Sequence, residues 1–338
     1  FAKILASVGV IFSVFLRINT LYQPNSLEYL LWTFLFYTII KFINEEDRKW
    51  LYLSAVTFAL GFLNKYNIGF LALGMLPAVL LTRHRKIFKN KHFYLAVGLA
   101  IIIILPNLIW QYVNGFPVFH HLRVLADTQL INVNRFDFLK DQLLFFTGSL
   151  FVILAAFISF FHERSFRKYI LILLTYFFVI TIYVYLKAKN YYSIGLYPVL
   201  LAFGSVYLER ILSSGWRKYL RPIAILIPVL TFIPMFHLML PVLSHEQIVQ
   251  RSDEFKKYGL TTWEDGQVYD IPQDYADMLG WKELAALVDS SFVYIEDKRN
   301  TIIHCVNYGQ AGAINFYSRQ NYTRAVTLHT DYINWYPL

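Results

Sequence analysis

The sequence has little cysteine and little charge. Cys305 is the only cysteine among 338 residues, which excludes an internal disulfide and a cysteine-based metal cluster. Charged residues make up 16% of the chain and hydrophobic residues 57%, whereas soluble globular domains have about 25% charged and about 45–50% apolar residues. This composition excludes a soluble globular protein, a disordered chain and a disulfide-stabilised secreted module. It is typical of a polytopic membrane protein.

Acidic residues are scarce in the first 243 positions. This part has 23 Lys and Arg against 9 Asp and Glu, whereas residues 244–338 have 8 basic and 13 acidic residues. A basic chain would ordinarily suggest a nucleic-acid partner. Here the basic residues lie in short loops between apolar runs, so membrane topology explains them and no nucleic acid is expected.

Apolar runs dominate residues 1–243. A spanning helix needs about 20 residues, and nine runs are candidates: 4–15, 27–42, 50–63, 66–81, 93–110, 143–161, 169–186, 192–212 and 222–243. We therefore expect an all-α polytopic membrane bundle with about nine transmembrane helices. Because the chain begins with Phe1 and the first run is short, we also expect the N-terminal helices of the whole protein to be missing.

Basic residues are unequally divided between alternate loops. One set of loops holds 15 Lys and Arg and the other set holds 7. The positive-inside rule places the richer set in the cytoplasm, so residues 111–142 and 244–338 are expected outside. The expected location is a bacterial inner (cell) membrane, crossed several times.

Residues 244–338 have the composition of a soluble domain. Residues 281–288 are predicted to form a helix after Gly280, and residues 291–295 and 301–306 are rich in β-branched and aromatic side chains, as strands are. Gly309 and Gly312 are expected to interrupt the chain before a further helix over 313–317. We predict a transmembrane domain over 1–243 and a small extracytoplasmic α/β domain over 244–338, which ends abruptly and is expected to be truncated.

Placing a polar side chain at membrane depth costs free energy, so such residues mark candidate functional sites. Two short segments on the outer side qualify. The first is Asn64-Lys65-Tyr66, which is either a tight turn with a snorkelling lysine or a cation at the rim of a cavity. The second is residues 187–192 (KAKNYY), which form either an interfacial aromatic belt or a phosphate-binding group made of Lys187, Lys189, Tyr191 and Tyr192.

Glu28 follows Pro24-Asn25-Ser26 at the outer start of the second run. Asn25 or Ser26 is a candidate helix cap, and the helix dipole favours an acidic residue in the first turn. An outer carboxylate is also a candidate acid, base or metal ligand.

The 111–142 segment carries His120, His121 and Arg123 among apolar residues, which is typical of a helix lying on a membrane surface. Adjacent histidines point about 100° apart on a helix, so they form a poor metal pair and no metal site is predicted. His120 and Arg123 remain candidate substrate-binding residues facing a cavity.

Four stretches resemble the membrane glycosyltransferases that use polyprenyl-phosphate sugars, the superfamily of dolichyl-phosphate-mannose protein mannosyltransferases and aminoarabinose transferases with the GT-C fold. They are residues 24–32 (PNSLEYLLW), 59–66 (ALGFLNKY), 187–192 followed by 196–198 (LYP), and 274–281 (DYADMLGW) with 307–313 (NYGQAGA). The resemblance implies transfer of a hexose or pentose from a polyprenyl-phosphate donor to an extracytoplasmic lipid, glycan or protein.

The resemblance also implies site residues. Glu28 matches an acidic residue near the donor site, and Lys65 matches a basic residue that lines the cavity. The segment from Lys187 to Tyr192 matches the loop that meets the lipid phosphate. The family's principal catalytic carboxylate lies in a first outer loop that this sequence lacks, so that residue is expected upstream of residue 1.

Cofactor and partner expectations follow from the same reading. The sequence identifies no certain cofactor and leaves a divalent cation as an open alternative. The expected partners are the donor, membrane lipids and the acceptor. Two rival functions remain: a lipid or polyol transporter or flippase, and a non-catalytic membrane subunit. A transporter predicts internal symmetry with broken helices in matching halves, which this sequence does not show.

Overall fold

The computed structural model describes residues 1–319 and 324–335. It divides into two compact units, the first made of residues 1–109 and 133–243 and the second of residues 110–132 and 244–338. The second unit thus takes in residues 110–132, which the sequence division assigned to the membrane domain.

The first unit is helical throughout. Its α-helices are α1 (Ala2–Ile11), α2 (Val14–Ile18), α3 (Asn25–Glu45), α4 (Lys49–Asn64), α5 (Ile68–Leu80), most of α6 (Lys91–Val113), α8 (Arg135–Leu144), α9 (Leu150–His162), α10 (Ile170–Tyr185), α11 (Tyr197–Ile211), α12 (Leu220–Phe232) and α13 (Phe236–Met239). Six 3-10 helices join them: η1 (Arg83–Lys89), η3 (Thr147–Ser149), η4 (Arg167–Tyr169), η5 (Asn190–Leu196), η6 (Gly215–Tyr219) and η7 (Ile233–Met235).

Each of the nine apolar runs is mostly helical. Five helical segments of the described chain are long and apolar enough to cross a membrane, or six if the pair α8 and η3–α9, bent by 64°, is counted as one span. The five are Asn25–Glu45, Lys91–Val113, Arg167–Tyr185, Asn190–Ile211 and Gly215–Met239. The protein is therefore an integral membrane protein. The expected nine spans exceed this number because α1, α4 and α5 have only 10, 16 and 13 residues, and at 1.5 Å per residue even α4 reaches only about 24 Å.

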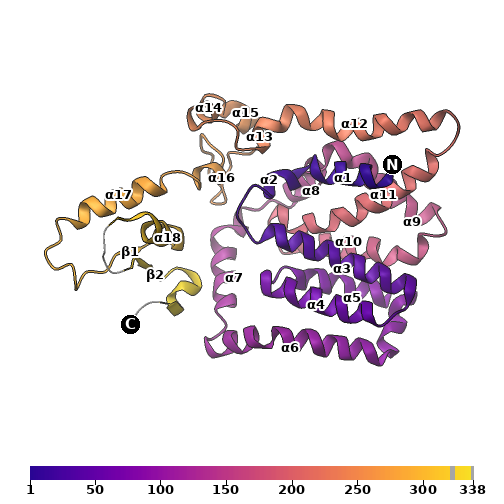
Figure 1. The fold of residues 1–338 in the computed structure, drawn as a ribbon, viewed down its shortest axis with the longest axis horizontal. Helices are drawn as coiled ribbons and strands as arrows, with labels where there is room; N and C mark the ends of the chain where they lie inside the picture. The colour runs from indigo at the N-terminus through magenta and orange to yellow at the C-terminus, as the bar shows by residue number, and fades with distance from the viewer. Residues whose placement is uncertain (320–323, 336–338) are drawn as a thin grey trace. The chain divides into compact units, whose positions relative to one another are not determined.

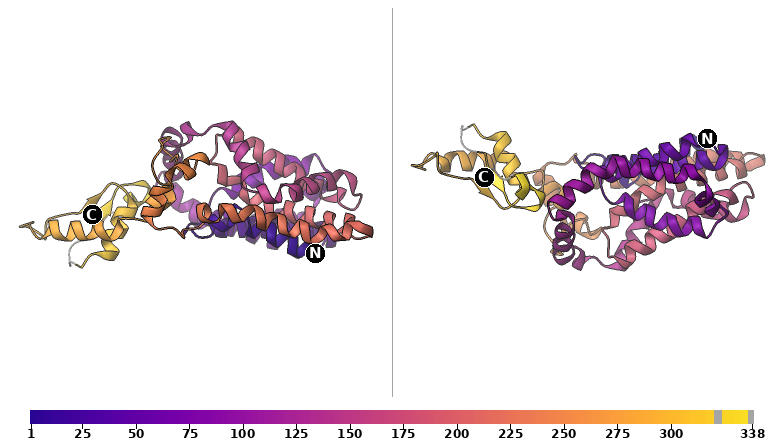
Figure 2. Two further views of the ribbon diagram at one scale, coloured as in Figure 1. Left: turned by 90° about the horizontal axis from the view of Figure 1, so that it is seen from above. Right: turned by 90° about the horizontal axis from the view of Figure 1, so that it is seen from below.

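Helices of the first unit pack in pairs, with α3 against α4, α5 against α10 and α9 against α11. Figure 1 shows the axes of α3, α4, α5, α6 and α12 roughly parallel or antiparallel to one another, and the turned views of Figure 2 show α12 beside α1. A Cβ at Gly204 would collide with the carbonyl oxygen of Val152, so the absence of a side chain lets α9 and α11 approach closely. Small residues commonly serve this purpose between membrane helices.

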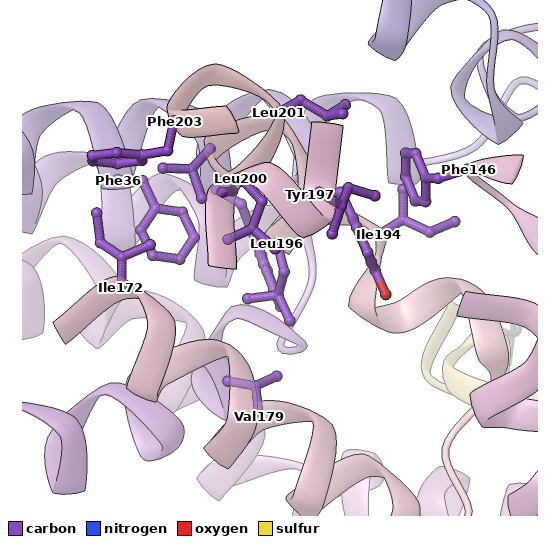
Figure 3. Packing of buried hydrophobic residues seen from close by; sticks show 14 of the residues in the cluster. Phe36, Phe146, Ile172, Val179, Ile194, Leu196, Tyr197, Leu200, Leu201 and Phe203 are labelled. Carbon is purple, nitrogen blue, oxygen red and sulfur yellow. The ribbon is translucent and has the colours of Figure 1, made fainter. Parts of the chain in front are cut away.

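The core of the first unit lies where α3, α10 and α11 meet (Figure 3). Phe36 of α3, Ile172 and Val179 of α10, and Leu200 of α11 are buried there. The aromatic rings of Phe146 and Tyr197 stack at a centroid distance of 4.2 Å. The 3-10 helix η5, which begins within the predicted phosphate-binding segment, packs against α3, and the hydroxyl of Tyr29 near the start of α3 donates to the Tyr191 carbonyl.

The second unit is mostly helical and includes a two-stranded parallel sheet. Its elements are α7 (Pro117–Thr128), η2 (Leu130–Asn132), α14 (His245–Gln250), α15 (Ser252–Lys257), α16 (Gln273–Ala276), α17 (Trp281–Phe292), β1 (His304–Cys305), α18 (Tyr308–Tyr317), β2 (Val326–Thr327) and η8 (Thr330–Trp335). In the sheet, His304 pairs with Val326 and Cys305 with Thr327.

Two details of the expected α/β domain are wrong. Residues 291–295 are not a strand, because Ser291 and Phe292 end α17. Gly309 and Gly312 do not interrupt the chain but lie inside α18, whose first turn is capped by the Asn307 side chain accepting from the backbone N–H of Gln310 at 3.0 Å. The helix after Gly280 is confirmed, and the predicted strand over 301–306 shortens to two residues.

Candidate functional site

Glu28 lies in the first turn of α3 and is completely buried. The helix begins after Pro24, and no side chain caps it. The expected capping role of Asn25 is therefore wrong: its side-chain amide donates to Gln23 Oε1 at 2.6 Å, and its Oδ1 accepts from Lys65. A buried carboxylate needs a partner to remain charged, and the neighbouring loop provides one.

Lys65 is that partner. It follows the end of α4 in extended conformation, and its Nζ lies 3.0 Å from Glu28 Oε2 and 2.7 Å from Asn25 Oδ1. The Lys65 side chain is 21% exposed. Its ammonium group also lies over the rings of Tyr192 and Tyr191, 4.6 and 5.3 Å from their centroids. Lys65 is therefore an ion-paired cation at a polar cluster that joins α3, the α4–α5 loop and η5, rather than a lysine snorkelling alone.

Asn67 and Tyr183 complete this cluster, and neither was singled out from the sequence. The Asn67 amide donates to Glu28 Oε1 and, at 3.1 Å, to the Tyr192 carbonyl oxygen. The Tyr183 hydroxyl donates to Asn67 Oδ1 at 2.7 Å. Asn67 stands two residues after Lys65 in an apolar run, which is a detectable signal. Tyr183 lies inside the apolar run of α10, where tyrosine is too common to stand out.

The loop around η5 brings the other predicted lysines to the same end of the first unit. Lys189 precedes η5 with its ammonium 6.0 Å from the Tyr191 ring centroid, and the Tyr29 hydroxyl donates to the Tyr191 carbonyl at 3.0 Å. Lys187 has a φ of 52°, a left-handed conformation that is uncommon outside glycine. Glu28 neutralises Lys65, and Lys187 and Lys189 bring two further cations to this end.

A second polar cluster, also missed from the sequence, holds η5 against α8. Asn190 donates to Asp141 Oδ2 at 2.8 Å, and Gln142 donates to the Asn190 carbonyl at 3.0 Å. The hydroxyls of Ser193 and Tyr197 both donate to Gln142 Oε1, at 2.6 and 3.1 Å. Asp141 is therefore a second carboxylate beside the lysine-bearing loop.

The remaining predicted residues lie elsewhere. Tyr66 donates its hydroxyl to Asn107 of α6 at 2.9 Å, so it ties the α4–α5 loop to α6 instead of joining the Glu28 cluster. His120 and Arg123 lie three residues apart on α7 in the second unit, and both are exposed. The amphipathic helix predicted there is present as α7.

The donor set does not fit a divalent cation. In the described parts of the chain, no three His, Cys, Asp or Glu side chains are grouped as metal ligands. Both oxygens of Glu28 already face nitrogen atoms, those of Lys65 and Asn67. An ion pair with Lys65 and the side-chain amide of Asn67 stabilise this carboxylate.

Comparison with known families gives one match. Residues 1–110 match the family described as dolichyl-phosphate-mannose-protein mannosyltransferase. The matched part contains Glu28, Lys65 and Asn67, whereas η5 lies outside it. Searches of curated proteins and of solved structures found no match.

Proposed function

Because residues 1–110 carry the sequence of the dolichyl-phosphate-mannose-protein mannosyltransferase family, which confirms the resemblance over that part of the chain, we propose that the protein is a membrane glycosyltransferase. It takes a sugar from a polyprenyl-phosphate donor and transfers it to an extracytoplasmic lipid, glycan or protein. The proposal includes the GT-C arrangement of the helices, up to nine spans and an outward-facing second unit.

The observation that carries the proposal is the buried Glu28–Lys65 pair beside η5. Transfer breaks the bond between the sugar's anomeric carbon and the phosphate oxygen, and the electron pair leaves with the lipid phosphate. Negative charge therefore grows on the phosphate, and fixed cations in a site of low dielectric stabilise it. Lys65, Lys187 and Lys189 supply such cations at one end of the first unit.

Glu28 is part of the proposed donor site, where its burial favours a positioning role. Its carboxylate is fully buried and bonded to Lys65 and Asn67, so it orients the Lys65 ammonium towards the η5 tyrosines. General base catalysis requires a carboxylate within reach of the acceptor hydroxyl, and Glu28 is screened from solvent by its partners. Tyr191 and Tyr192 pack against Lys65 and define the other wall of the proposed donor site.

The experiment uses the complete protein in liposomes with a polyprenyl phosphate that carries a labelled sugar. We expect label to appear in an acceptor fraction as polyprenyl phosphate is released. Movement of intact donor across the bilayer without bond cleavage would instead indicate a flippase. Absence of both cleavage and donor binding would indicate a non-catalytic subunit.

A further inference from the structure

A second charged region of the first unit lies at the other end of α3. Asn44, near the C-terminal end of that helix, accepts from Lys168 Nζ at 2.5 Å. Glu28 and Asn44 are sixteen residues apart on one helix, which at 1.5 Å per residue separates them by about 24 Å. The region is therefore distinct from the Glu28 cluster, and it belongs to the loops that the positive-inside rule places in the cytoplasm.

A pocket of about 720 Å³ opens between the α5–η1 connection and the loop that joins α9 to α10. Five basic residues contribute to its lining: Arg83, His84, Arg164, Arg167 and Lys168. The two loops are joined directly, because His84 Nε2 lies 2.6 Å from the Lys168 carbonyl oxygen. The basic groups are thus held around one concavity instead of being spread along separate loops.

Two of these cations are available to a ligand. Lys168 is engaged by Asn44, and Arg167 donates to the Phe161 carbonyl at 3.3 Å. The guanidinium groups of Arg83 and Arg164 make no hydrogen bond or ion pair with any described residue. The nearby acid Glu163 forms an ion pair with Arg210, whose Nη1 lies 3.2 Å from Glu163 Oε2. Glu163 therefore does not neutralise the cations of the pocket.

The pocket also has an apolar side. Leu81, Ile170 and Leu174 line it together with the cations, and Leu81 is 68% exposed. A ligand that matches both sides has a phosphate group joined to a hydrocarbon chain. Arginine binds phosphate oxygens through two parallel N–H donors, and basic pockets between membrane helices bind anionic lipid headgroups.

We propose that this pocket binds the phosphate of an anionic phospholipid in the cytoplasmic leaflet. Arg83 and Arg164 hold the phosphate, and the start of an acyl chain lies against Leu81 and Leu174. The assignment does not depend on the proposed glycosyl transfer, because it uses neither Glu28 nor any residue of η5.

The test measures lipid binding by the complete protein purified in detergent, using native mass spectrometry with added phosphatidylglycerol or phosphatidylcholine. The variant Arg83→Gln with Arg164→Gln is compared with the control Arg217→Gln with Lys218→Gln. The control removes two exposed cations from η6, a loop of the same basic set that does not line the pocket. Thermal unfolding of each variant establishes that the protein is folded.

We expect the pocket variant to bind phosphatidylglycerol about tenfold more weakly or worse, since it loses two charge-assisted contacts. The control should bind like the wild type, and phosphatidylcholine binding should be the same in all three proteins. Equal losses in both variants would show that loop charge alone attracts the lipid and would overturn the proposal.

Millimolar inorganic phosphate should not displace the lipid; displacement would assign the pocket to free phosphate instead. If the double variant is unfolded, Arg83→Lys, which keeps the charge but loses the paired donors, should still weaken binding, and unchanged binding would contradict the site.

Discussion

The two ends of α3 use charge in opposite ways. At the Asn25 end a few charged groups are buried and paired, with Glu28 fully buried and 3.0 Å from the Lys65 ammonium. At the Glu45 end, cations are more numerous, and Arg83 and Arg164 are exposed with no partner among the described residues. Counting basic residues identifies the second end and predicts its side of the membrane. Only burial and pairing identify the first end as the candidate site.

The largest expected effect comes from breaking the buried pair. Glu28→Gln leaves Lys65 without its counter-charge, and breaking a buried ion pair costs about 3–5 kcal/mol of stability. We expect a clear fall in the melting temperature of the purified protein, and a partial recovery when Lys65→Met is added.

The matched control for this change is Glu45→Gln, at the other end of the same helix. Glu45 pairs with Lys41 on the surface, and exposed pairs contribute little to stability. A melting temperature of Glu28→Gln equal to that of Glu45→Gln would refute the buried-pair account.

The next effect concerns Lys187 and Lys189, which precede η5. Lys187→Ala and Lys189→Ala should each lower kcat/KM for the polyprenyl-phosphate donor about tenfold or more, because each removes a charge-assisted contact with the phosphate. Arg217→Ala, on an exposed part of η6, serves as the comparison. Donor kinetics unchanged in both lysine variants would return this loop to the role of an interfacial aromatic belt.

A smaller effect is expected at Tyr183. Tyr183→Phe removes the hydroxyl that donates to Asn67 Oδ1 at 2.7 Å, and a buried acceptor left unsatisfied costs about 1–3 kcal/mol. Unfolding by denaturant should show this loss. Tyr185→Phe, which alters an exposed tyrosine two residues away, should leave the stability unchanged; equal effects in the two variants would mean that the Asn67 contact does not matter.

The final prediction concerns which segments face each side of the membrane, and its test does not depend on enzyme activity. Cys305 is a poor probe because it is buried, and burial raises the pKa of its thiol. In a Cys305→Ala background, an impermeant thiol reagent applied to intact cells should label a cysteine in place of exposed Asp265 but not one in place of exposed Arg85. The opposite pattern would invert the topology and move the basic pocket to the outer face.

Much of the fold follows from sequence patterns, because apolar runs must form helices in a membrane. Helix α17 was recognised from Gly280 and the residues that follow it. Only the C-terminal half of α18 was predicted, as a helix over 313–317, because its two glycines locally favour a break that the Asn307 cap and the burial of Ala311 and Ile314 offset. The number of spans was overestimated because a short apolar helix has the same composition as a helix that crosses the membrane.

The candidate site was only partly predictable. Glu28, Lys65 and the two lysines that precede η5 stood out because charge is rare in this part of the chain. The sequence did not reveal that Glu28 and Lys65 pair, since 37 residues separate them and only the packing of α3 beside α4 brings them together. Asn67 and Asp141 were missed for the same reason: their importance lies in contacts with distant segments.

We propose that Lys65, held by Glu28, receives the donor phosphate. The most direct measurement is sugar transfer by the complete protein in liposomes, comparing wild type with Lys65→Ala and with the pocket variant Arg83→Gln with Arg164→Gln at equal amounts of folded protein. The account predicts that Lys65→Ala lowers kcat/KM about tenfold or more, whereas the pocket variant still cleaves the donor. Transfer at the wild-type rate by folded Lys65→Ala would contradict the account.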